Sequence, residues 1–267
     1  MMENIIRDIQ LFLFDMDGTL YLGSRLFDFT IELLDTIKKQ GKRYMFMTNN
    51  SSKSVADYVS KLAKMGIEAT EDDFFTSSQA TALYLLEHHK NQKLYVCGTR
   101  SLKEELTKCG FEITEDVSST DCIVMGFDTE LTFRKLHDIS YLLLTRPDIP
   151  YIATNPDYVC PTEFGSVPDC GSVCDMLFNV SRRRPIVIGK PQPEMPLLAM
   201  KKAGVTAAQT AVVGDRIYTD IKSGLSAGAY TVLVLSGETT REILDASFDK
   251  PHAVMQSARE ILDILKK

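Results

Sequence analysis

The sequence predicts an α/β fold in which a parallel sheet carries helices on both faces and a second α/β domain is inserted into it. Two observations support this prediction. Short apolar runs alternate with segments of helical spacing near both ends of the chain, and a block with its own alternation separates the two ends. Strand–helix alternation of this kind is typical of parallel α/β sheets.

The N-terminal part predicts two strand–helix pairs. Residues 9–14 are almost entirely apolar, as expected of a strand buried on both faces. Apolar residues at 31–37 then recur with helical spacing, and Gly41 supplies a stop. The second pair is a strand at 44–47 and a helix at 55–65.

The same alternation returns after Lys190. Paired prolines mark the start of a helix, and short apolar runs before polar turns mark strands. The predicted elements are a helix at 195–203, a strand at 211–213, a helix at 219–227, a strand at 231–235, a helix near Arg241, a strand at 252–255 and a helix at 257–265.

The middle of the chain forms a self-contained block. It predicts strands at 94–97, 122–125 and 151–153 and helices at 102–109 and 133–144. A segment rich in Pro, Gly and Asp follows at 155–172; it is long for an irregular loop, which favours a functional role. We therefore expect a core domain of residues 1–77 and 185–267 and an inserted domain of residues 78–184.

Composition narrows the functional classes. The chain has 267 residues and a net charge of −6, which argues against nonspecific nucleic-acid binding. Its apolar stretches are all far shorter than the roughly 20 residues of a membrane span. Residues 1–8 do not resemble a signal peptide, so we expect a cytoplasmic protein without a membrane partner.

Six cysteines all lie in the middle block, and none belongs to a Cys-x-x-Cys pair. We expect reduced thiols. A zinc site or a disulfide involving Cys160, Cys170 and Cys174 remains an alternative, although their spacing matches no standard site.

Four short polar segments follow, or nearly follow, apolar runs. In a parallel sheet, ligands bind beyond the carboxyl ends of the strands, where the strand order reverses, so these segments should converge. Taken singly, each is explained by a turn, a helix cap or a solvated lysine; together they favour a site. The segments are Asp15-Met16-Asp17-Gly18-Thr19, Thr48-Asn49-Asn50, Lys190-Pro191 and Gly214-Asp215-Arg216-Ile217-Tyr218-Thr219-Asp220.

Convergence would crowd the carboxylates of Asp15, Asp17, Asp215 and Asp220 into one cleft. Neighbouring carboxylates repel one another, which raises pKa values unless a cation compensates. Mg²⁺ suits such a site because it takes a few carboxylate ligands, several waters and a phosphate oxygen. Asp215 is the best further metal ligand, and Asp220 is expected to partner a metal-bound water or Lys190.

The same segments contain the residue types of phosphoryl transfer. Asp15 is the candidate nucleophile, which would form an aspartyl phosphate. Asp17 is the candidate general acid and then the base for water, and Gly18 allows the tight turn between them. Thr48 and Lys190 would hold the phosphoryl oxygens, with Lys190 supplying positive charge to the transition state.

In this order, the four segments resemble the haloacid dehalogenase superfamily of phosphotransferases. The segment Thr154-Asn155-Pro156-Asp157, followed by Pro161-Thr162 and Gly165, resembles the NagD / p-nitrophenylphosphatase branch. The resemblance covers nearly the whole chain. It implies a Rossmann-like, doubly wound core, a class C2 α/β cap domain, Mg²⁺, and hydrolysis of small phosphomonoesters.

The resemblance also implies roles for individual residues. Asp15 becomes the nucleophile and Asp17 the acid/base, with the main-chain carbonyl of Asp17 also on the metal. The cap loop is expected to close over the substrate. The implied phosphate or substrate contacts are Thr48, Asn49, Lys190, Asn155 and Asp157; the implied metal ligands are Asp15, Asp17 and Asp215, with Asp220 behind them.

Three departures from the family pattern concern the substrate. Pro168-Asp169-Cys170-Gly171 replaces a more usual Pro-Gly-x-Gly, so Asp169 and Cys170 either face the leaving group or are solvated loop residues. Phe27-Asp28-Phe29 replaces a segment that usually contains proline. Arg182-Arg183-Arg184 stands where a glycine is common and is read as a solvated hinge, with substrate contact as the alternative.

Competing functions remain compatible with the sequence. A receiver-like signalling protein shares an acidic cluster, a Thr and a Lys, but it lacks the acid/base at Asp17 and is only about half as long. A non-catalytic phosphate-binding protein and a phosphomutase also stay open. The expected partner is a small phosphorylated metabolite: a sugar phosphate, a nucleotide, phosphoglycolate or pyridoxal phosphate. Caps of this kind sometimes mediate dimers, which leaves a homodimer open.

Overall fold

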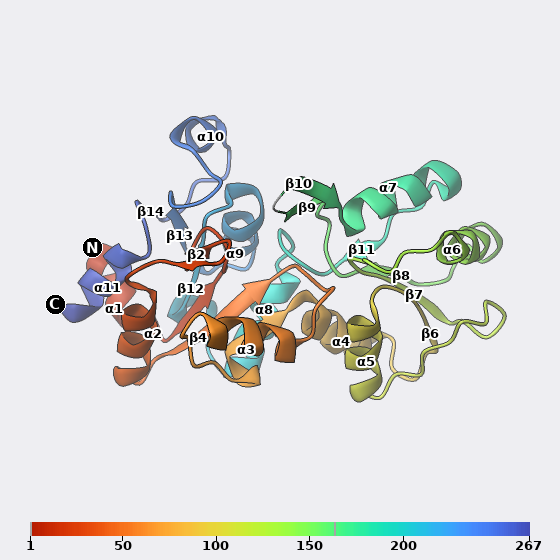
Figure 1. Ribbon diagram of the computed structural model, residues 1–267, viewed down its shortest axis with the longest axis horizontal. Coiled ribbons are helices and arrows are strands. Elements are labelled where there is room, and N and C mark those ends of the chain that lie inside the picture. The colour runs from red at the N-terminus through yellow and green to blue at the C-terminus, as the bar shows by residue number, and fades with distance from the viewer. Residues whose placement is uncertain (1, 163) are drawn as a thin grey trace. The chain divides into compact units, whose positions relative to one another are not determined.

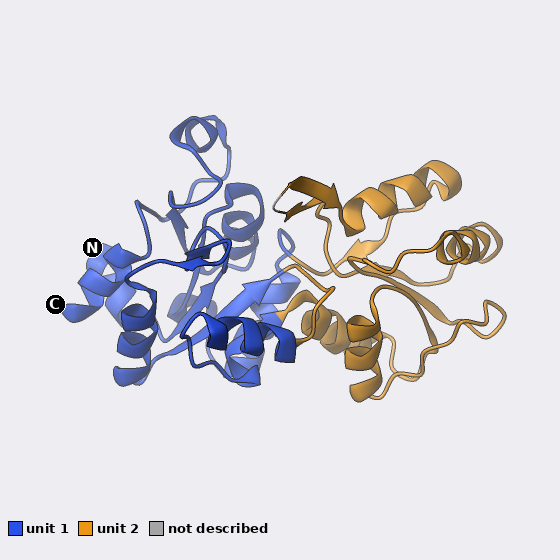
Figure 2. Ribbon diagram, viewed as in Figure 1, with its two compact units in different colours: residues 1–48, 55–75, 190–267 blue, residues 49–54, 76–189 orange. Residues whose placement is uncertain are grey.

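The structure is a computed structural model that describes residues 2–162 and 164–267. It divides into two compact units (Figure 2). The first contains Met1–Thr48, Val55–Phe75 and Lys190–Lys267, and the second contains Asn49–Ser54 and Thr76–Gly189. The domain limits expected from the sequence stay a prediction. Met1 of the expected core domain and Glu163 of the expected loop lie outside the described residues.

The first unit is built on a six-stranded sheet (Figure 1). The strand order is β14-β13-β12-β1-β4-β5. Parallel pairing joins β1 to both β4 and β12, β12 to β13, and β13 to β14, which confirms the predicted α/β fold. The strands are β1 (Leu11–Phe14), β4 (Arg43–Thr48), β5 (Phe74–Thr76), β12 (Thr210–Gly214), β13 (Tyr230–Val234) and β14 (Ala253–Met255).

Side chains alternate across this sheet, as the pleat requires. Phe12 and Phe14 face a large apolar core that includes residues of the helices α1 (Met2–Asp8), α2 (Thr30–Lys39), α3 (Val55–Lys64) and α11 (Arg259–Lys266). Helix α8 (Glu194–Ala203) packs against β1, and α9 (Lys222–Ser226) packs against β13. Leu225 of α9 contacts a cluster that contains Leu233, which belongs to the other face of β13.

Strand β1 lies between β12 and β4, and successive strands are added outwards from it on both sides. The strand order therefore reverses between β1 and β12. The carboxyl ends of these two strands form the switch point at which open α/β sheets bind ligands. Asp15 directly follows β1, and Asp215 directly follows β12.

Shorter elements complete the first unit. A hairpin of β2 (Tyr21–Leu22) and β3 (Arg25–Leu26) follows the first polar segment and was not predicted from the sequence. The remaining elements are three short helical turns, η1 (Glu71–Asp73), η2 (Ala207–Gln209) and η3 (Ile217–Ile221), and the helix α10 (Arg241–Ala246). No helix in the described ranges is both long and apolar enough to span a membrane.

The second unit has a parallel four-stranded sheet in the order β11-β8-β7-β6. Its strands are β6 (Leu94–Cys97), β7 (Cys122–Met125), β8 (Tyr151–Ala153) and β11 (Ile186–Val187). Its helices are α4 (Ser77–His88), α5 (Arg100–Lys108), α6 (Phe133–Thr145) and α7 (Cys170–Ser181). An inserted α/β unit of this kind matches the predicted cap domain in fold class.

The segment 155–172 differs from the predicted loop. It contains an antiparallel hairpin of β9 (Val159–Thr162) and β10 (Gly165–Pro168), and α7 begins at Cys170. Asp169 caps this helix because its carboxylate accepts a hydrogen bond from the Cys170 amide, at 2.5 Å. The hairpin has no buried face and so carries no alternating apolar pattern.

Candidate active site

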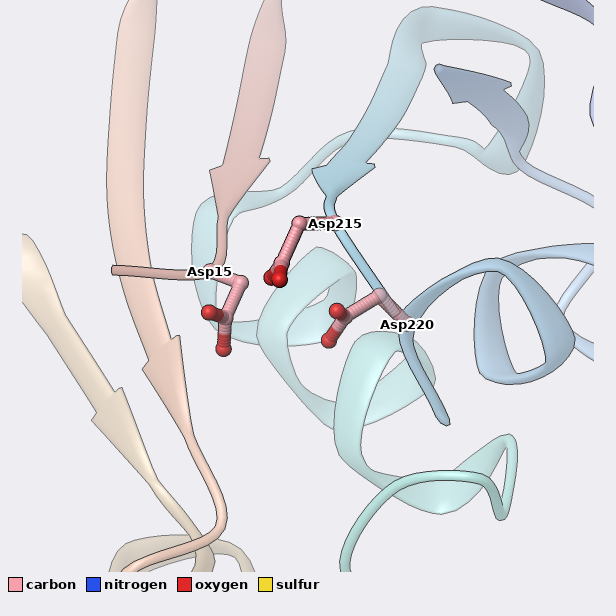
Figure 3. Close-up of side chains that lie close together, drawn as sticks. All are labelled: Asp15, Asp215 and Asp220. Carbon is pink, nitrogen blue, oxygen red and sulfur yellow. The ribbon is translucent and has the colours of Figure 1, made fainter. Parts of the chain in front are cut away.

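Three buried or half-buried carboxylates meet at the switch point of the first unit (Figure 3). One oxygen each from Asp15, Asp215 and Asp220 lies within 4.8 Å of the others. The Asp15 amide donates to the carbonyl of Val213 at 2.8 Å, which continues the pairing of β1 with β12 and fixes the spacing of their ends. Asp220 comes from the turn η3, five residues after Asp215, so two chain segments supply the cluster.

Lys190 neutralises part of this negative charge. Its Nζ donates to Asp15 Oδ1 at 2.7 Å, to Asp220 Oδ1 at 2.6 Å and to the carbonyl of Met47 at 3.1 Å. Burial alone would lower the pKa of Lys190, but the carboxylates of Asp15 and Asp220 outweigh burial and raise it. Lys190 therefore stays protonated and holds the two carboxylates in place.

Asp220 serves mainly to hold Lys190. Its Oδ1 accepts from Lys190, and its Oδ2 accepts from the amide of Arg216 at 3.1 Å. Burial raises the pKa of its carboxyl group, and Lys190 opposes that shift. Gly214 allows the Asp220 side chain to pack against the end of β12, because a Cβ added at Gly214 would lie 2.4 Å from the Cβ of Asp220. The partner predicted for Asp220 was a metal-bound water or Lys190, and the contact with Lys190 is present.

Asp215 is the least compensated carboxylate of the three. Its side chain is buried, Oδ2 accepts from the amide of Glu238 at 2.7 Å, and Oδ1 has no hydrogen-bond partner among the residues that the structure describes. Burial, followed by the carboxylates of Asp15 and Asp220, raises the pKa of Asp215 to about 7. The site therefore holds a buried acid whose ionised form needs a cation.

Because the ionised Asp215 carboxylate is buried and poorly compensated, we expect Asp215→Asn to stabilise the protein in EDTA at pH 8. A carboxyl group whose pKa is raised on folding binds its proton more tightly in the native state, so its contribution to stability is lost as the pH rises from about 4 to about 7. One pKa unit corresponds to about 1.4 kcal/mol, and coupling to Asp220 shares the shift, so we expect a gain of about 2 kcal/mol in the free energy of unfolding.

Denaturant titrations at pH 5 and pH 8 would measure this gain. The difference between variant and wild type should be small at pH 5, where Asp215 is largely protonated in the folded state, and largest above pH 7. A variant that is less stable than wild type at pH 8 would show that the carboxylate is already compensated in the metal-free protein.

Asp17 lies outside the carboxylate cluster. Its side chain is exposed, and Oδ1 accepts from the amide of Gly23 at 3.1 Å, in the turn that joins β2 to β3. Gly18 follows with φ +82°, a conformation that favours glycine. The predicted roles of Asp17, as acid/base and as a main-chain metal ligand, stay predictions.

The predicted contacts in the second unit form a network of their own. Asn49 Nδ2 donates to Asp157 Oδ2 at 2.8 Å, and Asn155 Nδ2 donates to the same oxygen at 2.9 Å and to Asp169 Oδ1 at 3.1 Å. Asn155 Oδ1 accepts from Thr154 at 2.8 Å. Asn155 is fully buried, and its side chain holds Asp157 and Asp169 together through one amide group. Substrate contact by Asn49, Asn155 and Asp157 stays a prediction.

The arginine run and Asp169 are engaged within the second unit. Arg183 donates to the carbonyls of Arg146 and Ile149 at 3.0 and 2.6 Å, and Arg184 forms an ion pair with Asp175. Arg182 ends α7 with φ 58°, a left-handed conformation that glycine adopts more readily than other residues. The cysteines are thiols in the structure, with the sulfurs of Cys170 and Cys174 3.9 Å apart.

Sequence reasoning missed the segment 236–239. Ser236 Oγ donates to the carbonyl of Gly18 at 2.6 Å, and the amides of Glu238 and Thr239 donate to Oδ2 and to the main-chain carbonyl of Asp215. The segment follows the carboxyl end of β13 almost directly. The strand-end rule that identified Asp15 and Asp215 would have found it.

The parallel sheet, the acidic cluster at its switch point and the inserted α/β unit together define a class of phosphate-ester hydrolases. A family model described as haloacid dehalogenase-like hydrolase matches residues 12–112, and a second HAD-like hydrolase model matches residues 187–261. The chain belongs to the haloacid dehalogenase-like hydrolase family.

The chain matches several phosphatases over nearly their whole length. It is 34% identical to the 5'-nucleotidase YutF of Bacillus subtilis over 93% of this chain and 96% of that protein, and 31% identical to the acid sugar phosphatase of Staphylococcus aureus over 98% and 100%. Among solved structures, it is similar to the 4-nitrophenylphosphatase of Thermotoga maritima, with 39% identity, 98% coverage of each chain and a TM-score of 0.90.

NagD of E. coli K-12 is a further structural relative, with 31% identity, 94% and 98% coverage and a TM-score of 0.87. The predicted resemblance to the NagD / p-nitrophenylphosphatase branch is confirmed. The chain is a phosphoric monoester hydrolase of the haloacid dehalogenase type. This result sets aside a receiver-like protein, a non-catalytic phosphate-binding protein and a mutase.

Proposed function

We propose that this phosphatase hydrolyses small phosphomonoesters through an aspartyl phosphate on Asp15, with Mg²⁺ as its cofactor. The observation that carries the proposal is the meeting of Asp15, Asp215, Asp220 and the Lys190 ammonium at the β1/β12 switch point. The Asp15 side chain keeps 18% of its surface exposed, whereas those of Lys190 and Asp220 keep 4% and 1%. Asp15 is thus the member of the cluster that a substrate can reach.

The donor set fits a hard divalent cation. Asp215 belongs to the carboxylate cluster, and its Oδ1 is buried and lacks a partner in the described chain. Carboxylate oxygens are the ligands that Mg²⁺ prefers. Asp15, Asp215 and the main-chain carbonyl of Asp17 would hold the ion, while Asp220 is occupied by Lys190. When bound, Mg²⁺ supplies positive charge that offsets the carboxylates and the phosphoryl oxygens.

The side chains divide the reaction between them. Asp15 attacks phosphorus, the ester oxygen leaves, and Asp17 gives that oxygen a proton. Asp17 then accepts a proton from the water that attacks the aspartyl phosphate, which restores both carboxyl groups and releases phosphate. Lys190 stays protonated throughout and stabilises charge on the transferred group, with Thr48 and Asn49 as further proposed phosphate contacts.

The test is turnover of p-nitrophenyl phosphate with and without divalent cation. We expect activity in Mg²⁺, loss of activity in excess EDTA, and its return when Mg²⁺ is added beyond the EDTA concentration. Restored activity rules out unfolding as the cause of the loss. Full turnover in EDTA would falsify the metal assignment and leave the phosphatase class intact.

For the substrate, we propose a small phosphorylated metabolite. Two relatives bear the names 5'-nucleotidase and acid sugar phosphatase, which makes nucleoside monophosphates and sugar phosphates the first compounds to compare. A panel that adds phosphoglycolate and pyridoxal phosphate, ranked by kcat/KM, would choose between them. Equal and low kcat/KM across the panel would contradict a substrate of these classes.

A further inference from the structure

The segment 236–239 binds the loops that hold the acidic cluster. Ser236 Oγ reaches the carbonyl of Gly18, while the amides of Glu238 and Thr239 reach Asp215. The hydroxyl of Thr239 also accepts a hydrogen bond from the amide of Ile217, at 3.1 Å. One short segment after β13 therefore binds both the loop after β1 and the loop after β12.

The Glu238 side chain is attached to the loop after β12 at both of its oxygens. Oε2 pairs with Arg216 Nε at 2.8 Å, and Oε1 accepts from the hydroxyl of Tyr218. Arg216 and Tyr218 lie one and three residues after Asp215 in the chain. Glu238 thus contacts this loop with its side chain and with its main-chain amide.

These contacts decide which oxygen of Asp215 is available. The Glu238 amide occupies Oδ2, which leaves Oδ1 buried and without a partner in the described chain. Space is tight on two sides, since a Cβ added at Gly18 or Gly237 would lie 2.5 or 2.0 Å from Oδ2. The carboxylate is therefore held in one orientation by a hydrogen bond and by close packing.

We propose that Glu238 is a positioning residue for the Asp215 carboxylate. Its side chain, anchored by Arg216 and Tyr218, keeps the 237–238 peptide aligned so that the amide binds Oδ2 and Oδ1 remains free for the cation. This inference rests on the proposed role of Asp215 in binding Mg²⁺. Groups that orient a metal ligand commonly contribute tenfold or more to metal affinity.

If Glu238 contributed only to the stability of the fold, its removal would lower the melting temperature and leave metal affinity unchanged. The paired side chains of Arg216 and Glu238 keep 30% and 44% of their surface exposed, and ion pairs this exposed contribute little to stability. Loss of the pair should therefore leave the melting temperature almost unchanged. A positioning role requires a change in metal affinity at nearly constant stability.

The experiment measures Mn²⁺ binding to the full chain without substrate, from the electron paramagnetic resonance signal of free Mn²⁺. We expect Glu238→Ala to raise the dissociation constant about tenfold. Glu238→Gln keeps an oxygen and an amide for the same anchors and should stay closer to wild type, and Tyr218→Phe, which removes one anchor, should fall between. Asp249→Asn breaks the comparably exposed Lys222–Asp249 pair of the same unit and should leave affinity unchanged.

Kinetics give a second measure. In Glu238→Ala, the Mg²⁺ concentration for half-maximal activity should rise by the same factor, and kcat at saturating Mg²⁺ should remain near wild type. Wild-type Mn²⁺ affinity in Glu238→Ala, or an equal loss in the alanine and glutamine variants, would overturn the proposal; the latter result would assign the effect to charge alone.

The variant Asp215→Asn separates the positioning role of Glu238 from the proposed metal site. If it loses Mn²⁺ binding while Glu238→Ala keeps it, the positioning role fails and the proposed metal site stands. If Asp215→Asn binds Mn²⁺ as wild type does, the metal site itself fails, and the role of Glu238 fails with it. Should Glu238→Ala not fold, Glu238→Gln and Tyr218→Phe still test the anchors, and wild-type affinity in both would overturn the proposal.

Discussion

Replacing Asp15 with Asn is expected to lower kcat for p-nitrophenyl phosphate by at least about 10⁴-fold. The amide has no ionised oxygen with which to attack phosphorus. It also removes the negative charge that Lys190 pairs with at 2.7 Å. Because Asn can revert to Asp by deamidation, Asp15→Ala should be measured beside it. Asp8→Asn, an exposed carboxylate of the same unit, is the matched control and should keep wild-type kcat.

The intermediate can be sought directly in the wild-type protein. Turnover is quenched with acid, the acyl phosphate is reduced with borohydride, and the peptides are weighed by mass spectrometry. The mass change of the reduced side chain should fall on Asp15 and be absent from the Asp15→Ala variant. A label that appears reproducibly on another residue, or the absence of a label while turnover continues, would rule out covalent catalysis at Asp15.

The second large effect is expected for Asp17→Asn, with a loss of about 10²-fold or more in kcat. The turn itself should survive, because the Asn carbonyl oxygen can still accept the hydrogen bond that Gly23 now donates to Asp17 Oδ1. What is lost is the proton for the leaving oxygen and the base for water. The loss should be larger for a sugar phosphate than for p-nitrophenyl phosphate, since nitrophenolate departs with less need of a proton.

The dependence on the leaving group makes this prediction specific. Rates for a series of aryl phosphates should show a steeper dependence on leaving-group pKa in the variant than in wild type. Asp35→Asn, an exposed carboxylate nearby in the sequence, should behave as wild type. If Asp17→Asn retained wild-type kcat on an alkyl phosphate, another group would have to be the acid.

The core sheet could be predicted from the sequence because each of its central strands is an apolar run that ends at a polar residue. The strands that carry Asp15, Thr48 and Asp215 are buried on both faces, which is what the runs indicated. The β9–β10 hairpin could not be predicted in this way. Both of its strands are mostly exposed, so burial left no pattern in their residues.

The apolar residues before Lys190 show a second limit of prediction from the sequence. They form β11, but this strand pairs with β8 in the sheet of the second unit, whereas Lys190 bonds to Asp15 and Asp220 in the first. An apolar run indicates a strand and says nothing about which sheet receives it. The sequence predicted that Lys190 converges with the acidic residues because all four segments follow apolar runs of one parallel sheet. The convergence is present, but the run before Lys190 belongs to a different sheet.

The segment 236–239 shows why part of the site was missed. Two of its bonds to Asp215 come from main-chain amides, which every residue except proline possesses. Such donors leave no signature in the residue types. Only the position after a strand end, together with the glycine at 237, could have drawn attention to it.

The chain passes between its two compact units at positions that bear on whether the second unit can be exchanged between relatives. The chain first passes from the first unit to the second between Thr48 and Asn49, and it makes its last return between Gly189 and Lys190. Both points adjoin residues proposed to hold phosphate. Most of the second unit is a single uninterrupted stretch, Thr76–Gly189. An exchange of this stretch between relatives would therefore change none of Asp15, Asp215 and Asp220.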